Sequence, residues 1–501
     1  MPHRDELPVV VIGAGPIGLV AAAHLAARGL PFLVFESGDT VGAAVRRWSH
    51  VRMFSPWRYN VDPIAAELLA SQGWVTPDPE RYPTGAELLA GWLEPLARHP
   101  SIAPSLRLGH RVTAVARQGR DKLSSYDRAG QPFVVRVSTP TGEQDFLARA
   151  VLDASGAVPN PLGASGLPAL GEARLAGRIA YGMPDVLGHE REHYAGKRTL
   201  VVGAGHSAFG VLLDLATLAE RVPGTTVHWA IRRRSLTGRL GSLSDELPER
   251  GRLGQRVAEL LAHGTITLHT GVLVDRVEAD EAGITVYSGE RALPPVDRIV
   301  CATGYRPDLA PLRELRLALD PVVEAPVALA PHIDPRYHSC GTVPPHGVEE
   351  LAHPQEPDFF IVGLKSYGRA PTFLLRTGYE QVRSIVAALA GDWEAARRVE
   401  LELPATGVCS GEVGETCCGR PSEADRATKT VEIPIASMPE LRTGSVCCTA
   451  SSNAEEGFPT CPWPRPGTGL SQSDCTRQSR NDAACCAEHT AQSTVGTATC
   501  C

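Results

Sequence analysis

The first 408 residues of this 501-residue chain contain almost no cysteine. Only Cys301 and Cys340 occur there, whereas 11 of the 13 cysteines lie at or after Cys409. The N-terminus shows no charged-then-apolar signal pattern, because its apolar run ends in glycines. We therefore expect no export signal and no disulfide scaffold.

Long apolar runs and clusters of positive charge are also missing. No apolar stretch is long enough to cross a bilayer, and a net charge of −7 without a long basic run argues against nucleic-acid binding. An apolar fraction of 43% is typical of a globular enzyme. We expect a cytoplasmic protein of two or three domains that binds neither membrane nor nucleic acid.

A glycine-rich turn stands near the start of the chain. Residues 9–12 form a short β-branched run, followed by Gly13, Gly15 and Gly18 in G-x-G-x-x-G spacing and then by an Ala/Leu-rich helix up to Arg28. This context predicts a strand, a tight turn and a helix N-terminus that binds a pyrophosphate. Glu36 ends the next predicted strand, where a carboxylate accepts hydrogen bonds from a ribose hydroxyl.

The same pattern returns in the middle of the chain. A strand at 198–202 leads into Gly203, Gly205 and Ser207, with Ala208 in place of the third glycine. Residues 149–160 and 298–308 also align with each other, Gly156 with Gly304. Two such units in one chain suggest two nucleotides, one that donates electrons and one that accepts them.

These residues resemble the superfamily of flavin monooxygenases and pyridine nucleotide-disulfide oxidoreductases over roughly residues 7–392. The resemblance implies an α/β fold with two Rossmann-like dinucleotide-binding domains. The expected boundaries are 1–165 with 305–400 for a discontinuous FAD domain, 166–304 for an NAD(P)H domain, and 403–501 for a disordered Cys-rich tail. The first glycine turn is similar to the FAD site of that superfamily and the second to its nicotinamide site.

Within the superfamily, the redox dithiols of the thioredoxin-reductase and glutathione-reductase branches have no counterpart here. The chain resembles the monooxygenase-like branch more, and in particular the flavin monooxygenase-like proteins of bacterial arsenic resistance. Of the monooxygenase fingerprint F-x-G-x-x-x-H, Gly177 is kept, but Tyr181 stands where the histidine would be. Electron transfer from NADPH to FAD is thus expected more firmly than oxygen insertion.

Several further residues are expected around the two cofactors. Arg232 and Arg233 follow the second strand of the nicotinamide unit and favour NADPH by pairing with its 2′-phosphate, unless they are only a solvated basic loop. The stretch from Trp48 to Asn60 is expected to form the floor of the flavin pocket. Within that stretch, Arg52 and Arg58 would stabilise negative charge on the flavin, with structural packing as the alternative.

The late strand–loop–helix of residues 358–390 resembles the segment that returns to the flavin in this superfamily. The resemblance places Gly363, Lys365 and Thr372 near the ribityl chain or the flavin carbonyls. Thr372 is also the predicted N-cap of the helix. Gly156 and Gly304 are expected beside the nucleotides, in the short segments that close each unit.

Cysteine and histidine residues supply the remaining candidates. Cys340, near His338, His346 and His353, is either a thiol that faces the substrate or part of a structural loop. The tail carries four adjacent cysteine pairs, which would bind a soft metal or metalloid or else belong to an unconstrained extension. These pairs are Cys417-Cys418, Cys447-Cys448, Cys485-Cys486 and Cys500-Cys501.

The sequence therefore predicts an FAD- and NADPH-dependent oxidoreductase of the monooxygenase-like type, linked to metalloid or metal detoxification. One alternative is an NADPH-dependent flavin reductase or oxidase without oxygen insertion. A second is a soft-metal-binding protein whose flavin core is vestigial. The expected partner is a small-molecule or metalloid substrate, and a homodimer stays open as the assembly.

Overall fold

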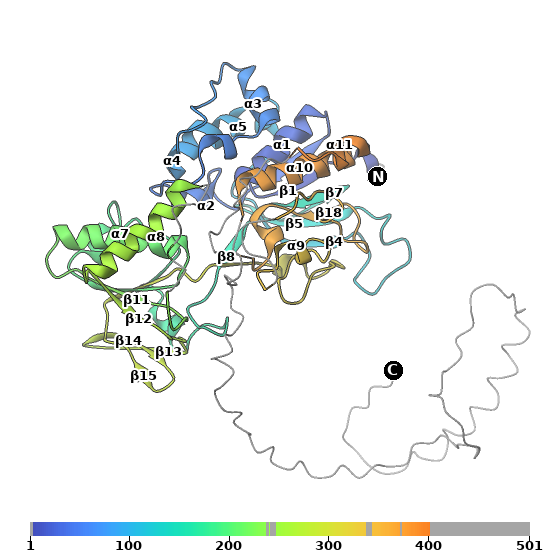
Figure 1. Cartoon of the computed structure of the whole chain (residues 1–501). Helices are drawn as coiled ribbons and strands as arrows, with labels where there is room; N and C mark the ends of the chain where they lie inside the picture. The colour runs from blue at the N-terminus through green and yellow to red at the C-terminus, as the bar shows by residue number, and fades with distance from the viewer. Residues whose placement is uncertain (1–3, 237–239, 241–246, 337–342, 371–372, 401–501) are drawn as a thin grey trace, which may run out of the picture. The chain divides into compact units, whose positions relative to one another are not determined.

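The computed structural model describes residues 4–236, 240, 247–336, 343–370 and 373–400. Two five-stranded parallel sheets organise this part of the chain (Figure 1). The first sheet has the order β18-β7-β1-β2-β3, and the second has the order β9-β16-β10-β11-β12. The strands of the first sheet are β1 Val9–Ile12, β2 Phe32–Phe35, β3 Leu106–Arg107, β7 Ala150–Asp153 and β18 Phe359–Ile361. The strands of the second sheet are β9 Ile179–Tyr181, β10 Arg198–Val202, β11 Thr226–Ala230, β12 Ile266–His269 and β16 Arg298–Cys301.

Each parallel sheet is covered by helices on one face and by a small antiparallel sheet on the other. In β1, Val9 and Val11 pack toward the helices, whereas Val10 and Ile12 pack toward the antiparallel sheet. This alternation is the two-residue period of a strand that is buried on both faces. The antiparallel sheet on the first parallel sheet consists of β4 Arg111–Arg117, β5 Phe133–Thr139 and β6 Gly142–Ala148. The one on the second parallel sheet consists of β13 Arg276–Asp280, β14 Gly283–Ser288 and β15 Arg291–Ala292.

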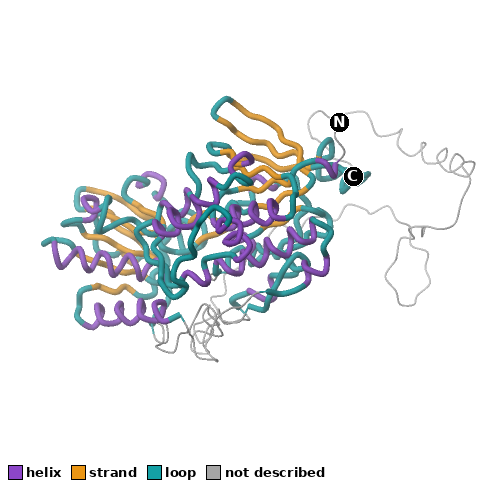
Figure 2. The backbone as a smooth tube through the Cα atoms, turned by 90° about the horizontal axis from the view of Figure 1, so that it is seen from above, coloured by secondary structure: helices purple, strands orange, loops and turns teal. Residues whose placement is uncertain are grey.

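Long helices lie against the strands of both parallel sheets (Figure 2). On the first sheet, α1 Pro16–Ala27 packs beside α10 Leu375–Leu389 (Figure 1). On the second sheet, α7 His206–Arg221 packs beside α8 Pro248–Ala262. Shorter helices are α2 Ala43–Arg46, α3 Pro63–Ala70, α4 Gly85–Leu88, α5 Glu94–Arg98, α6 Arg191–Tyr194, α9 Ala330–Ile333 and α11 Trp393–Arg397.

The α/β class and the repeated nucleotide fold are confirmed, but several predicted elements differ from the structure. The apolar run at 146–152 predicts a single strand, but it forms two, because the chain leaves the antiparallel sheet after β6 and enters the parallel sheet as β7. The run at 272–277 predicts a strand, which begins only at Arg276. The amphipathic pattern at 85–98 predicts one helix, and this helix contains a π-helical turn, Leu89–Leu93, between α4 and α5.

The two segments that align in the sequence also pair with each other. Strand β8 Ala157–Pro159 is antiparallel to β17 Tyr305–Pro307. These two strands follow β7 and β16, which occupy equivalent places in their sheets. The internal repeat is therefore visible both in the strand order and in the segments that leave each sheet.

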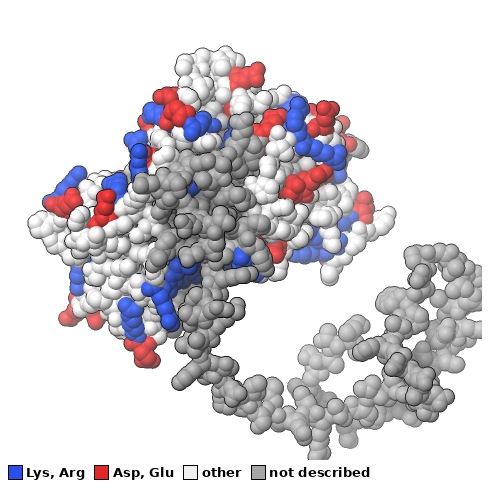
Figure 3. Space-filling model, viewed as in Figure 1, with Lys and Arg blue, Asp and Glu red and all other residues white. Residues whose placement is uncertain are grey.

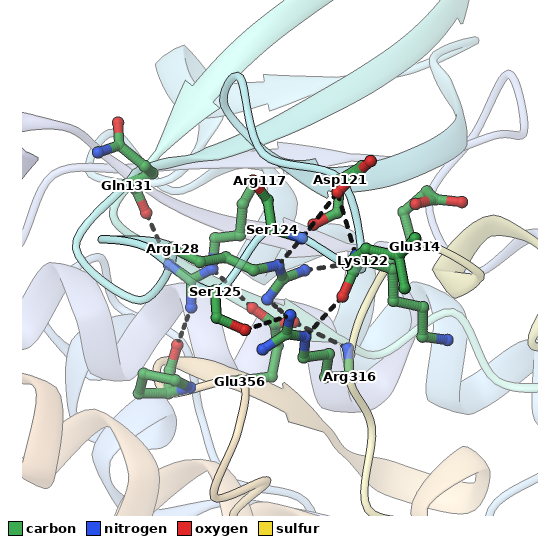
Figure 4. Close-up of polar contacts among 12 residues, drawn as sticks. Arg117, Asp121, Lys122, Ser124, Ser125, Arg128, Gln131, Glu314, Arg316 and Glu356 are labelled. Carbon is green, nitrogen blue, oxygen red and sulfur yellow. Dashed lines mark hydrogen bonds and ion pairs between the residues drawn. The ribbon is translucent and has the colours of Figure 1, made fainter. Parts of the chain in front are cut away.

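A buried ion cluster fastens the antiparallel sheet β4–β6 to the chain beyond residue 313. The Glu356 carboxylate accepts hydrogen bonds from Arg117 Nε and from Arg128 at 2.6 Å each, and from the Arg316 N–H at 2.9 Å (Figure 4). Arg117, Arg128 and Glu356 are all buried. Buried charges of this kind stay in place only when they are paired and hydrogen-bonded.

At the surface, acidic and basic side chains are interspersed on the face that Figure 3 shows. Among the described residues, no helix combines the length and the apolar character that a membrane crossing requires.

Candidate nucleotide-binding sites

The first glycine turn joins β1 to α1 and admits only glycine at two positions. Gly13 has φ of +99°, and a Cβ there would lie 2.8 Å from the carbonyl oxygen of Ala154. A Cβ at Gly18 would overlap the carbonyl oxygen of Gly13. Strand and helix can therefore approach each other closely only without these side chains.

Gly15 has a different role in the same turn. Its φ of −81° suits any residue, and a Cβ there would face open space. No side chain caps α1, so the backbone N–H groups of its first turn after Pro16, which has none, keep their hydrogen-bonding capacity. Open space in front of an uncapped helix N-terminus fits a pyrophosphate group.

Glu36 is fixed beside this turn. Its side chain is buried and accepts hydrogen bonds from the N–H groups of Ala14 and Gly38, both at 2.8 Å. An ionised carboxylate offers about four acceptor positions, so these two contacts orient Glu36 without exhausting it. The geometry fits acceptance of a ribose hydroxyl from the FAD nucleotide.

The second glycine turn repeats this construction between β10 and α7. Gly203 has φ of +137°, and a Cβ there would overlap the carbonyl oxygen of Ala302. Gly205 faces open space at the uncapped N-terminus of α7, and Ser207 lies half-buried in its first turn. This second turn fits a second pyrophosphate.

The two units differ at the place of the ribose acid. The register pairs Ile12 with Phe35 and Val202 with Ala230, so the position of Glu36 is taken by Ile231 in the second unit. Arg232 follows and is exposed, and Arg233 is half-buried. The residue types at this corner therefore fit a 2′-phosphate better than a free ribose hydroxyl.

The closing segments also carry left-handed glycines. Gly156 has φ of +79° and Gly304 has φ of +98°. The N–H of Asn160 donates to the carbonyl of Gly304 at 2.9 Å, which ties the two segments together. Their contacts with the nucleotides stay predictions.

The returning segment reaches the first glycine turn through Gly363, where a Cβ would lie 2.9 Å from the Ile17 side chain. Two residues later, Lys365 is buried, and its Nζ donates to Asp153 at 2.7 Å and to Ser155 Oγ at 3.1 Å. The sequence interpretation did not include this ion pair. An acid at the end of the closing strand is the signal that could have indicated it. The role of Lys365 toward the flavin stays a prediction.

The predicted cap of α10 is wrong. The helix begins at Leu375 with Leu374 at the N-cap position, and no side chain caps it. Thr372 itself lies outside the described residues.

The Arg/Trp-rich stretch has contacts within the protein. Trp48 packs on Gly85, Arg52 donates to the carbonyl of Tyr82 at 2.8 Å, and Arg58 pairs with Glu80. From the same stretch, the Phe54 ring lies 5.5 Å from that of His206, in the second glycine turn. The stretch therefore touches the nicotinamide unit, while catalytic roles for Arg52 and Arg58 stay predictions.

The cysteine and histidine candidates lie largely elsewhere. Cys340, His338 and all tail cysteines fall outside the described residues. His346 and His353 are buried, with Nδ1 of each bonded to backbone, and burial lowers the pKa of His353 to about 4. Within the described ranges, no group of three potential metal ligands occurs. These two histidines thus match the structural-loop alternative.

Comparison with known proteins gives a family and several relatives. Residues 7–324 match the pyridine nucleotide-disulphide oxidoreductase family. The chain is 33% identical over 224 residues to indole-3-pyruvate monooxygenase YUCCA1 of Oryza sativa subsp. japonica, covering 44% of this chain and 48% of that protein. The chain thus spans about half the length of that relative.

A ferredoxin–NADP reductase of Salinispora arenicola is 28% identical over 320 residues, covering 63% of this chain and 79% of that protein. Among solved structures, bacillithiol disulfide reductase Bdr from Bacillus cereus has a TM-score of 0.57 at 20% identity, covering 77% of this chain and 99% of that one. This likeness supports the fold alone. Because the family match spans more than half of the sequence, this protein belongs to the pyridine nucleotide-disulphide oxidoreductase family.

Proposed function

We propose that this chain is a monooxygenase-like enzyme that oxidises NADPH, inserts one atom of molecular oxygen into a small soft substrate and reduces the other atom to water. Its family membership makes it an oxidoreductase, with FAD and NADPH as cofactors. When bound, FAD accepts a hydride from NADPH and passes electrons to the acceptor.

The residues of this chain supply binding and orientation. Gly15 and Gly205 leave room for the two pyrophosphates in front of helix N-termini. Glu36 is held in place to accept a ribose hydroxyl. The Lys365–Asp153 pair holds the returning segment against the end of β7, next to the first glycine turn.

One observation carries the choice of acceptor. Both nucleotide turns are intact, yet the described residues contain one cysteine, Cys301, and it is buried. Burial raises the pKa of the Cys301 thiol, which disfavours the nucleophilic thiolate. Among the described residues this single buried thiol cannot form a redox dithiol, and no cysteine precedes it in the sequence, so neither glycine turn is followed by the cysteine pair of a disulfide reductase. This supports an acceptor such as molecular oxygen.

The proposal leaves open both the electron acceptor and the substrate class. The relatives named ferredoxin–NADP reductase favour a reductase that passes electrons on without oxygen insertion. The cysteine pairs of the 403–501 tail favour a soft metal or metalloid as substrate or cargo.

The strands that make up each parallel sheet support the predicted domain boundaries, which are 1–165 with 305–400 for the FAD domain and 166–304 for the NAD(P)H domain. Cytoplasmic location stays a prediction.

A labelling experiment separates these functions. The FAD-loaded full-length protein is given NADPH, ¹⁸O₂ and methyl phenyl sulfide, a soft nucleophilic probe. One ¹⁸O atom in the sulfoxide for each NADPH oxidised supports the monooxygenase. NADPH oxidation that yields hydrogen peroxide without labelled sulfoxide supports the oxidase or reductase. No NADPH oxidation by the flavin-loaded protein supports the vestigial core.

A further inference from the structure

A cavity of about 600 Å³ lies outside the two glycine turns. It is lined by the stretch before and within α3, by residues 76–79, and by Arg376 in the first turn of α10. Its volume falls in the range that small-molecule sites occupy. None of the glycine-turn residues lines it, but Trp57, Arg58 and Tyr59 do, so the cavity adjoins the stretch that the sequence predicts as the floor of the flavin pocket.

The walls of the cavity are mainly apolar. The apolar and aromatic residues that line it are Trp57, Tyr59, Val61, Pro63, Ala66 and Pro77. Trp57 is buried, and its indole N–H finds no acceptor among the described residues. Buried indole N–H groups usually have a hydrogen-bond partner. The cavity therefore offers a mainly apolar lining, and one of its lining residues carries a donor with no partner among the described residues.

Charge in the cavity is unbalanced. Two arginines line it, and Arg58 is already paired with Glu80 and lies over the Tyr59 ring at 5.0 Å. Arg376 is half-buried, and its guanidinium makes no hydrogen bond or ion pair with any described residue. Arg376 also stands at the uncapped N-terminal end of the 15-residue helix α10, where the helix dipole adds positive potential.

We propose that this cavity binds a small carboxylate with a flat apolar body. The Arg376 guanidinium pairs with the carboxylate, because its planar fork matches the two carboxylate oxygens. The body of the ligand packs between Trp57, Tyr59 and the prolines. The proposal concerns binding alone, and it does not depend on which acceptor the flavin reduces.

Calorimetric titration of the FAD-loaded full-length protein with two matched probes tests this site. Phenylacetate carries the carboxylate, and phenylacetamide has nearly the same shape without the charge. We expect phenylacetate to bind at least about tenfold more tightly than the amide. Equal affinities, or no binding of either probe at about 10 mM, would overturn the proposal.

Variants locate the binding. Arg376→Gln should remove the tenfold preference for the acid, whereas Arg98→Gln, an exposed arginine on α5, should leave it unchanged. Persistence of the preference in Arg376→Gln contradicts the proposed site. Ala66→Leu, which fills the cavity from α3, should abolish binding of both probes. If the Arg376→Gln protein loses its flavin absorbance, the test rests on Ala66→Leu. Unchanged binding of both probes to Ala66→Leu would then show that they do not bind in this cavity.

Discussion

Glu356 holds a buried negative charge between Arg117 and Arg128, with contacts of 2.6 Å to each. Removing one member of a buried ion cluster leaves charges without a partner, which costs about 3–5 kcal/mol. We therefore expect Glu356→Gln to lower the free energy of unfolding by about that amount. Denaturant unfolding of the two proteins measures the difference.

The matched control is Glu94, which also lies between two arginines but at the surface. It contacts Arg46 at 2.8 Å and Arg98 at 3.6 Å. Surface ion pairs contribute about 0–1 kcal/mol, so Glu94→Gln should change stability little. Equal losses of unfolding free energy in the two variants would show that burial does not determine how much an ion cluster stabilises this protein.

The pH dependence of the Glu356 effect follows from its surroundings. Burial raises the pKa of Glu356, but the Arg316 N–H and the guanidiniums of Arg117 and Arg128 outweigh burial and hold the pKa below its usual value. A lowered pKa stabilises the folded state above the unfolded-state value of about 4.3. The stability gap between wild type and Glu356→Gln should therefore narrow as the pH falls below about 4.

Arg232 and Arg233 are the residues that we expect to determine the preference for NADPH over NADH. Because the equivalent of Glu36 is Ile231, no carboxylate from that position repels a 2′-phosphate. Hydrogen bonds to charged groups contribute about 1.5–3 kcal/mol, so the double change to alanine should reduce the NADPH-over-NADH ratio of kcat/KM by roughly 10–100-fold. Arg234→Ala, at an exposed neighbouring residue, is the control. An unaltered ratio in the double variant excludes these arginines as the determinant.

At the scale of the element, α1 and α7 both begin with a glycine at an uncapped N-terminus. We expect the N-terminus of α1 to bind FAD and that of α7 to bind NADPH. Gly15→Ala and Gly205→Ala add a methyl group that meets no protein atom within 4 Å. Both variants should therefore fold, but the methyl group should occupy the space of a phosphate. We expect Gly15→Ala to weaken FAD binding by at least about tenfold and Gly205→Ala to raise the KM for NADPH without loss of FAD.

Flavin content and steady-state kinetics measure these two effects. Gly18→Ala serves as the contrasting variant, because its Cβ would overlap a backbone carbonyl and should lower stability itself. Loss of FAD in Gly205→Ala, or unchanged FAD affinity in Gly15→Ala, contradicts the assignment of one cofactor to each turn.

Elements with a strong local pattern could be predicted from the sequence. The β-branched run at 9–12 and the glycine spacing predict β1, the turn and α1, because local sterics decide them. Helix α8 carries three arginines, two glutamates and two glycines and has only four buried residues, and the sequence interpretation missed it. Its position depends on packing against α7, which no local pattern records.

At the scale of the whole molecule, the unpredicted features join distant segments. Strand β18 pairs with β7 although about 200 residues separate them, and Lys365 bonds Asp153 across the same gap. The resemblance to a family implied that both ends of the chain build one domain. The buried partners that hold the ends together depend on tertiary packing, and only the structure shows them.

The last prediction separates the core from the Cys-rich tail. Both parallel sheets and the buried Lys365–Asp153 ion pair lie within residues 4–400. A chain that ends at residue 402 should therefore fold, bind FAD and oxidise NADPH at the rate of the full chain. The same truncation removes all four adjacent cysteine pairs, so it should abolish arsenite protection in a thiol titration. Truncation that removes NADPH oxidation would show that the tail serves catalysis, whereas full thiol reactivity of the intact chain with arsenite would reject metalloid capture.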